Sequence, residues 1–322
     1  MTKVSDTKRK AAPLIGAVIC LALGLVACTS AEDGATGQDP TVTTPTTTVP
    51  PLLQQARTVN RSNHVSERFT PTPVVVDDPW GFETSKIFFD NSEVLIISDG
   101  DPQSQLRAAS LAVVAHAPMV VYSSDHHAAV VREIERLDTH TVFAVGNVPV
   151  LNYSEKLTVI RDPGGLDALE KATALQFGEK VVDAPEKAVA AVAGLDPNDP
   201  VWLKSGYGGE QHVEDRAKEG VVPLQSRQNA EMAPHVIAVA SSPLAAVATA
   251  RGFGADVYVV DDPDPRVDDR ALLVMTGLAD KPLIALGPEF GTDEELRSRI
   301  KEAEATAESR SFAGIEKLPQ VL

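Results

Sequence analysis

The sequence predicts an α/β protein built from tandem Rossmann-like units with parallel sheets, two or three in number, preceded by a disordered stalk rich in Thr and Pro. Short apolar strands alternate with Ala-rich helices from about Val59 onward, and the same pattern returns near the C-terminus. Strands separated by helices of roughly 10 to 15 residues are typical of right-handed βαβ units, whose parallel sheet is covered on both faces. The segment Thr29–Pro51 is too poor in apolar residues to form a core.

Residues 1–27 are predicted to be a signal peptide. Four basic residues precede an apolar run over 11–23, which is short for a membrane span. The run ends in Leu-Val-Ala-Cys at Cys28, which resembles the lipobox of bacterial lipoproteins. In such proteins the cysteine thiol takes a diacylglycerol and the peptide is cut just before it, so Cys28 is the predicted lipidation site. The alternative is an uncleaved anchor helix with an incidental cysteine.

Residues 28–58 are predicted to form the lipidated stalk. The run Thr41–Pro51 consists almost entirely of Thr, Pro and Val, and such a segment stays extended or disordered. It would lift a folded domain off the membrane. Its Thr-Pro cluster is either a bare spacer or a site of O-linked glycosylation.

The charge and the cysteine count exclude several classes of function. The formal net charge is −16, and it becomes about −19 without the first 27 residues, which carry four basic residues and one acidic residue. Such a surface argues against nucleic acid as a partner, and against adhesion to anionic lipid or polymer through a basic patch. Cys20 would leave with the signal peptide and Cys28 would carry the lipid, so no disulfide or catalytic thiol is expected.

The first α/β unit is predicted over residues 59–160 and the second over residues 235–322. Val94 corresponds to Val236 with an offset of 142, and Gly146 to Gly287 with an offset of 141. A near-constant offset favours an internal duplication, although any α/β protein repeats strands and helices. In the first unit we expect strands at 93–98, 119–122 and 141–146 with helices at 103–115 and 128–137; in the second, strands at 235–240, 256–260 and 281–287 with helices at 244–251, 268–276 and 294–307.

The stretch 161–234 is less regular. It contains two helical segments, a strand at 201–204 and the loop Gly206–Gly209. We interpret it either as bridging helices or as a degenerate third repeat.

Three short motifs in the first unit follow a known order. The turn Ser98–Asp101, the tripeptide His116–Pro118 and the strand end Val145–Asn147 resemble those of the cell wall-binding repeat 2 family of Gram-positive surface proteins. The second unit matches more weakly, through 254–256 and 286–288. Pro102–Leu106 departs from the family's Phe-Pro-Asp-Ala-Leu, and no separate effector domain is visible. The resemblance implies tandem α/β repeats that bind an anionic wall polymer.

Ligands of open α/β sheets lie beyond the carboxyl ends of the strands. This rule selects four loops as candidate ligand-binding sites, and they supply Asp99, Asp101, Asp125, His126, Ser241 and Asp261. The alternative for the acidic residues is capping of the helices that follow. Histidine with carboxylate could bind zinc and the later Asp cluster calcium, but adjacent histidines and rigid Pro-rich turns disfavour both, so no metal and no cofactor is predicted.

No phosphate loop and no nucleophile elbow appears, and Trp80 and Trp202 are interpreted as core or edge residues. We therefore expect a non-enzymatic lipoprotein on the extracytoplasmic face of the bacterial cell membrane. Its partner would be a cell-wall glycan or an envelope protein, and the lipid on Cys28 would hold it to the membrane. The alternative is the solute-binding lipoprotein of an ABC-type transporter, which would show two lobes hinged around a deep cleft.

Overall fold

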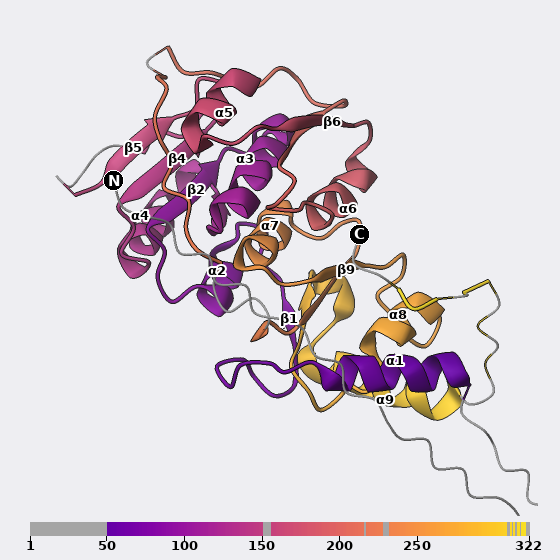
Figure 1. Ribbon diagram of the computed structural model, residues 1–322. Coiled ribbons are helices and arrows are strands. Elements are labelled where there is room, and N and C mark those ends of the chain that lie inside the picture. Colours follow the sequence, from indigo (N-terminus) through magenta and orange to yellow (C-terminus); the bar gives the residue numbers. More distant parts are fainter. Residues whose placement is uncertain are drawn as a thin grey trace, which may run out of the picture. The chain divides into compact units, whose positions relative to one another are not determined.

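The computed structural model describes residues 50–150, 156–215, 217–227, 232–307, 310, 312, 314–315 and 317–319. All of them fall within one compact unit, Thr47–Leu322. The predicted signal peptide, Cys28 and the stalk up to residue 49 lie outside the described residues. The predicted α/β class with parallel sheets is confirmed, because every strand pairing among the described residues is parallel apart from one isolated bridge (Figure 1).

The strands form three sheets. One sheet has the order β3-β2-β4-β5, a second β1-β10-β8-β9, and a third β6-β7. The strands are β1 Pro73–Val76, β2 Val94–Ser98, β3 Met119–Val121, β4 Thr141–Val145, β5 Thr158–Arg161, β6 Gly178–Val182, β7 Val201–Ser205, β8 His235–Ala238, β9 Val257–Val259 and β10 Leu283–Leu286. The central strands β2 and β4 are buried at every residue, as runs without polar alternation predict for strands covered on both faces.

Helices connect and cover these strands. They are α1 Pro51–Ser62, α2 Phe82–Phe88, α3 Pro102–Ala115, α4 His127–Arg136, α5 Leu166–Thr173, α6 Ala188–Ala193, α7 Leu244–Phe253, α8 Asp269–Met275 and α9 Asp293–Thr306, with short 3₁₀ turns η1 Ser124–His126, η2 Pro185–Lys187 and η4 Pro288–Phe290. Within the described part of the chain, no helix has the length and apolar character that crossing a membrane requires.

The two four-stranded sheets have the same strand order when one is read in reverse: β5-β4-β2-β3 corresponds to β1-β10-β8-β9. Thus β2, β3 and β4 occupy the places of β8, β9 and β10. In each sheet the fourth strand comes from outside that unit's own βαβαβ core. β5 adds to β4, whereas β1 adds to β10 with Val74 opposite Ile284. β1 lies in the range expected for the first unit, yet it completes the sheet of the second. Its four residues carry no sequence pattern that identifies so distant a partner.

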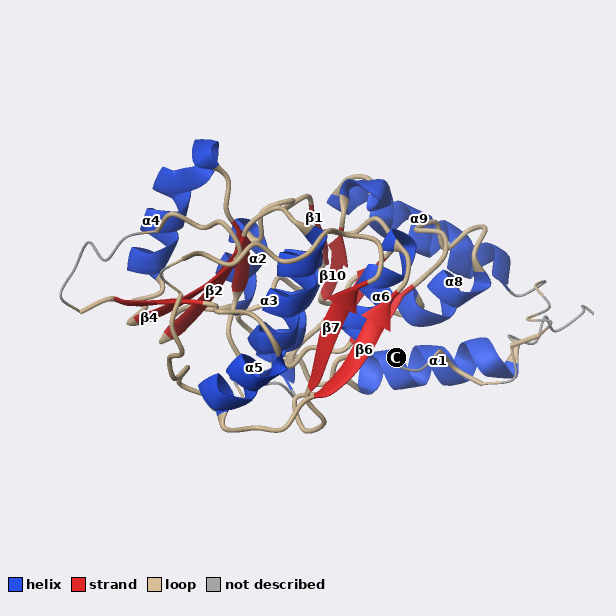
Figure 2. Ribbon diagram, turned by 90° about the horizontal axis from the view of Figure 1, so that it is seen from above, coloured by secondary structure: helices blue, strands red, loops and turns tan. Residues whose placement is uncertain are grey.

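The middle stretch follows the same plan but is shorter. The succession β5-α5-β6-α6-β7 repeats β1-α2-β2-α3-β3, and β6 and β7 pair as β2 and β3 do. Beyond β7, the described residues 206–215, 217–227 and 233–234 contain neither helix nor strand. The arrangement therefore matches a third copy of the unit that lacks its last helix and last strand. In Figure 2, β6 and β7 lie side by side next to α6.

Three equivalent helices, α3, α6 and α7, pack against one another at the centre. Each also covers the edge strand of another copy. Thr249 Oγ1 of α7 accepts from Met119 N of β3 at 3.0 Å, Ser110 Oγ of α3 accepts from Leu203 N of β7 at 2.9 Å, and α6 contacts β9. Gly252 permits this close packing, because a Cβ there would lie 2.6 Å from Ala117 O. Each copy thus contributes a helix that covers the edge strand of another copy: α7 covers β3, α3 covers β7 and α6 covers β9.

The predicted stalk is wrong in its last residues. Residues 51–58 belong to α1, which begins with Pro at its first position, where the missing N–H costs no hydrogen bond. Leu53, Ala56 and Asn60 share one buried face of α1, and Leu53 and Ala56 pack in one cluster with Leu272 and Leu273. Figure 2 shows α1 beside α8. Because the residues just before Pro51 are rich in Thr and Pro, the sequence did not indicate that a helix with a buried face begins there.

Asn60 closes the end of a helix that is distant in sequence. Its Nδ2 donates to the carbonyls of Leu273, Val274 and Thr276 at 3.0, 2.9 and 3.0 Å. The last carbonyls of a helix have no partner within the helix, so this side chain satisfies them from outside.

We expect Asn60→Ala to destabilise the fold by about 2–3 kcal/mol, because buried carbonyls would be left without a donor. Urea unfolding followed by circular dichroism measures the change. Thr58→Ala, on the exposed side of the same helix, is the matched control and should change stability by less than about 0.5 kcal/mol. Equal effects of the two substitutions would contradict the capping role.

Candidate functional site

A groove of about 690 Å³ lies at the carboxyl ends of β5 and β7. Three segments form it: the first turn of α3, the loop after β5, and the end of β7 with the loop that follows. Its lining residues are Gln103, Pro163, Gly164, Gly165, Trp202, Lys204, Ser205, Gly208, Gly209, Glu210, Gln211 and Val213. This is the edge at which parallel sheets usually bind ligands.

A buried ion pair lies next to the groove. Arg107 Nε and Nη2 donate to the two carboxylate oxygens of Asp162 at 2.5 and 2.8 Å, and both side chains are fully buried. Asp162 also accepts from Gly164 N at 3.1 Å and from Gln211 Nε2 at 2.6 Å. One carboxylate therefore holds α3, the loop after β5 and the loop after β7 together.

Trp202 lies in the groove wall, and two cations lie close to its ring. Arg107 Cζ and Lys204 Nζ each lie 4.9 Å from the centre of its ring. Trp202 Nε1 and Arg107 Nη1 are buried donors that have no acceptor among the described residues. A buried donor without an acceptor costs about 1–3 kcal/mol. Because Trp202 lines the groove, its N–H would be stabilised by an acceptor that reaches it from there.

The loop after β7 is fixed against the start of α3. Ser205 N donates to Gln103 Oε1 at 2.7 Å, and Ser205 Oγ accepts from Tyr207 N at 3.3 Å and Gly208 N at 2.8 Å. Burial raises the pKa of Tyr207, and the carboxylates of Asp101 and Glu186 raise it further, so this phenol stays protonated at neutral pH. The loop is thus preorganised before any ligand arrives.

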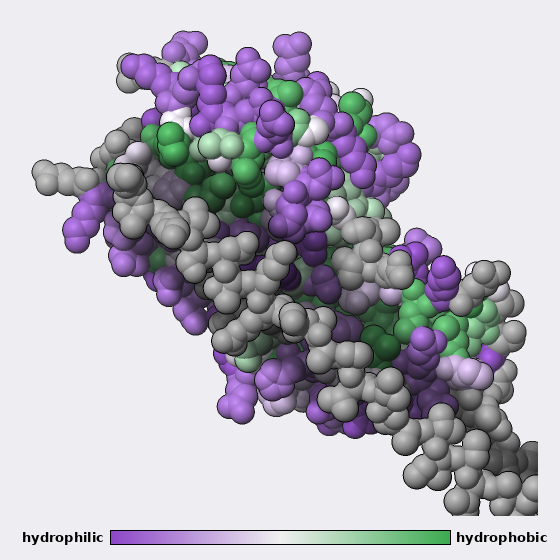
Figure 3. All heavy atoms as spheres, in the orientation of Figure 1, coloured by the Kyte–Doolittle hydropathy of each residue, from purple (hydrophilic) through white to green (hydrophobic). Residues whose placement is uncertain are grey.

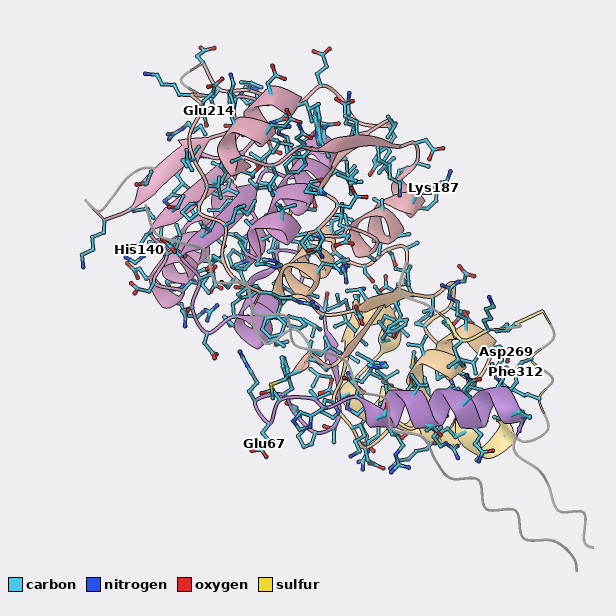
Figure 4. The ribbon with its side chains drawn as sticks, viewed as in Figure 1. Glu67, His140, Lys187, Glu214, Asp269 and Phe312 are labelled. Carbon is cyan, nitrogen blue, oxygen red and sulfur yellow. The ribbon has the colours of Figure 1, made fainter. Side chains whose placement is uncertain are left out.

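The groove surroundings are polar. Glu214, on the same loop, pairs with Arg161 at 2.7 Å, and Figure 4 shows it above α5. In Figure 3, hydrophilic side chains gather over the part of the molecule where α5 and β6 lie in Figure 1. Together these features suit a polar ligand.

Asp99 and Asp101 make internal contacts near one rim of the groove. Asp99 accepts from Asn147 N at 2.6 Å and Asp101 N at 3.0 Å, and thereby joins the loops after β2 and β4. Asp101 caps α3 by accepting from Gln103 N at 2.8 Å. These contacts agree with the capping alternative, since the carboxylates bind backbone N–H groups of their own fold.

The other candidate residues follow strands of both sheets and do not form one site with the groove. His126 Nδ1 lies 2.7 Å from Ser123 Oγ, and the centre of its ring lies 4.4 Å from that of Trp80 with the two rings tilted by 31°. Asp125 is exposed. In the other sheet, Ser241 Oγ donates to Glu289 Oε1 at 2.5 Å, and Asp261 is exposed. Within the described ranges, no group of three or more His, Cys, Asp or Glu side chains is placed to hold a metal ion.

Sequence reasoning missed Arg107, Asp162 and the role of Trp202. An Arg within a helix and an Asp after a short strand are common on surfaces, and 55 residues separate them. The available signal was the Gly-rich loop at 206–209, which follows a strand in the manner of a ligand-binding loop.

No family model and no curated protein matches the sequence. The resemblance to the cell wall-binding repeat 2 family therefore has no support from a family match. Among solved structures, the chain is similar to Cwp6 from Clostridium difficile, at 12% identity and a TM-score of 0.42. The similarity covers 71% of this chain and 48% of Cwp6, so the chain matches about half of that protein's length.

Proposed function

We propose that the protein is a lipid-anchored, non-enzymatic binding module of the bacterial cell envelope, and that its groove holds an oxygen-rich cell-wall glycan. The observation that carries this proposal is the buried donor Trp202 Nε1, which has no acceptor among the described residues and belongs to the wall of a groove that also presents Lys204, Gln103 and Gln211.

The donor set matches the chemistry of a wall glycan. Such polymers expose hydroxyl, ring, acetamido and carboxylate oxygens, all of which accept hydrogen bonds. Because cations already lie over the ring of Trp202, we infer that its N–H, rather than stacking of its ring, recognises the ligand. Sites built to hydrogen-bond a ligand discriminate strongly, since a ligand without the matching oxygen leaves the donors unpaired.

The polar groups of the groove support binding rather than catalysis. Ser205 Oγ accepts from two backbone N–H groups, and Gln211 Nε2 and Arg107 both donate to Asp162. These contacts fix the walls of the groove in place. The anchor part of the proposal is supported by the signal-like residues 1–27 and by the lipobox that ends at Cys28.

The proposal predicts that the unlipidated chain Thr29–Leu322 is retained on purified wall material. Trp202→Phe removes one N–H and keeps an aromatic ring, and it should weaken glycan binding at least tenfold, or about 1.4 kcal/mol. Isothermal titration with soluble wall fragments measures the affinity, and Lys204→Ala should lower it as well.

Trp80→Phe is the matched control, because Trp80 lies in the loop after β1 and does not line the groove. It should bind as the parent chain does. A protein that is not retained on wall material would refute the glycan proposal. Full affinity in Trp202→Phe and Lys204→Ala would place the binding site elsewhere.

A further inference from the structure

A second depression, of about 310 Å³, is lined by α1, the turn after α8, and α9. Arg57 and Arg61 come from α1, Lys281 from the turn and Lys301 from α9; we call these four residues the basic pocket. Its lining also includes Asp280 and Glu304. The two arginines of α1 lie more than 200 residues before the two lysines in the sequence, so only the fold brings the two pairs together.

Both carboxylates of this depression already have several partners. Glu304 accepts from Thr276 Oγ1 at 2.9 Å and from Gly277 N, and lies 3.9 Å from Arg57 Nη2. Asp280 pairs with Lys301 at 3.3 Å and with Arg297.

Two of the four cations remain unpaired at this depression. Arg61 and Lys281 are exposed, and neither forms an ion pair with another residue that the structure describes. The depression therefore keeps an excess of positive charge, on a chain whose net charge is −16. The sequence argued against a basic patch because it gives the total charge and not its distribution.

The basic pocket lies on the first helix of the described chain. α1 begins at Pro51, and 22 residues separate it from Cys28, the proposed lipid anchor. A chain of this length reaches at most roughly 75 Å. Through such a tether, the membrane surface would be present at the second site at an effective concentration in roughly the millimolar range. Even a site of low intrinsic affinity for the membrane would then be occupied.

We propose that the basic pocket binds the phosphate of an anionic phospholipid headgroup and docks α1 and α9 on the membrane surface. The anchor at Cys28, part of the proposed function, supplies the proximity. The headgroup contact itself depends on neither the lipid on Cys28 nor the glycan groove. Each Lys or Arg near an anionic membrane surface strengthens binding roughly fivefold.

The test is sedimentation of Thr29–Leu322 with vesicles of phosphatidylglycerol and phosphatidylcholine in equal parts, and with pure phosphatidylcholine vesicles. This chain keeps every helix and strand that the structure describes. We expect binding to the anionic vesicles alone, and weaker binding as salt is raised. Arg61→Glu/Lys281→Glu should reduce the affinity at least tenfold, and a circular dichroism melt should show an unchanged fold.

Lys171→Glu/Lys187→Glu is the control. It changes the net charge equally on α5 and η2, where each lysine forms only an exposed ion pair. It should keep most of the vesicle binding. Absence of binding to anionic vesicles, or equal losses in the two double variants, would overturn the proposal. Saturable binding of inorganic phosphate without vesicle binding would also overturn it, and would indicate a site for a soluble anion. None of these outcomes affects retention by wall material. The headgroup proposal and the glycan proposal can therefore be refuted independently.

Discussion

Asp162→Ala is expected to lower the free energy of unfolding by about 3–5 kcal/mol, because it leaves the guanidinium of Arg107 charged, fully buried and without its carboxylate. The loss extends beyond the ion pair. Gly164 N and Gln211 Nε2 also lose their acceptor, so the two loops that wall the groove lose their common support. Urea unfolding followed by tryptophan fluorescence measures the change.

The double variant Arg107→Met/Asp162→Leu distinguishes the contribution of the ion pair to stability from that of the packing around it. Apolar residues of similar volume often replace a buried ion pair with little loss of stability, so the double variant should be more stable than Asp162→Ala. It should nevertheless bind wall glycan weakly, because Gln211 in the groove wall has lost its hydrogen bond to Asp162. A loss of less than 1 kcal/mol in Asp162→Ala would contradict the structural role of the pair.

Cys28→Ala is expected to move nearly all of the protein from the membrane fraction to the soluble fraction under a high-salt wash. Each buried methylene of an acyl chain contributes about 0.8 kcal/mol, and two or three chains far exceed what the basic pocket supplies. Salt of roughly 0.5 M screens the headgroup contact and leaves the lipid anchor unaffected. Fractionation and immunoblotting measure the distribution, and mass spectrometry identifies the species.

Cys20→Ala is the matched control, because Cys20 lies in the apolar run and should be removed with the signal peptide. It should leave the protein on the membrane. The mass also separates a processed, unlipidated Cys28→Ala chain from an uncleaved precursor, which residues 11–27 would retain in the bilayer. A processed Cys28→Ala chain that resists the salt wash would contradict anchoring through Cys28.

The buried strands could be predicted from sequence, whereas the contacts that join distant segments could not. Val94–Ser98 and Thr141–Val145 are apolar runs of strand length bounded by polar residues, and this local signal fixes both their type and their burial. Pro73–Val76 has the same character, but nothing local indicates that it pairs with Leu283–Leu286. Pairing partners are chosen by the packing of the whole chain, which periodicity does not report.

The groove shows the same limit. The loop at 206–209 was visible as a Gly-rich turn after a strand, and the capping of α3 by Asp101 follows from its position before Pro102. The coupling of Arg107 to Asp162 depends on α3 lying against the start of the loop after β5, which no spacing in the sequence specifies. Likewise, a net charge of −16 could not reveal that Arg61 and Lys281 meet at one depression.

The pairing of β1 with β10 also constrains how the chain can fold during its synthesis. Pro73 is opposite Leu283, so the first strand to emerge lacks its partner until 210 further residues have followed. At a synthesis rate of about 5–20 residues per second, this delay is roughly 10 to 40 seconds. During that time Val74–Val76 is an unpaired apolar edge, prone to aggregation and open to chaperones and proteases. A chain truncated before β10 would stay in that condition, so loss of the last forty residues should lead to degradation rather than to a smaller folded protein.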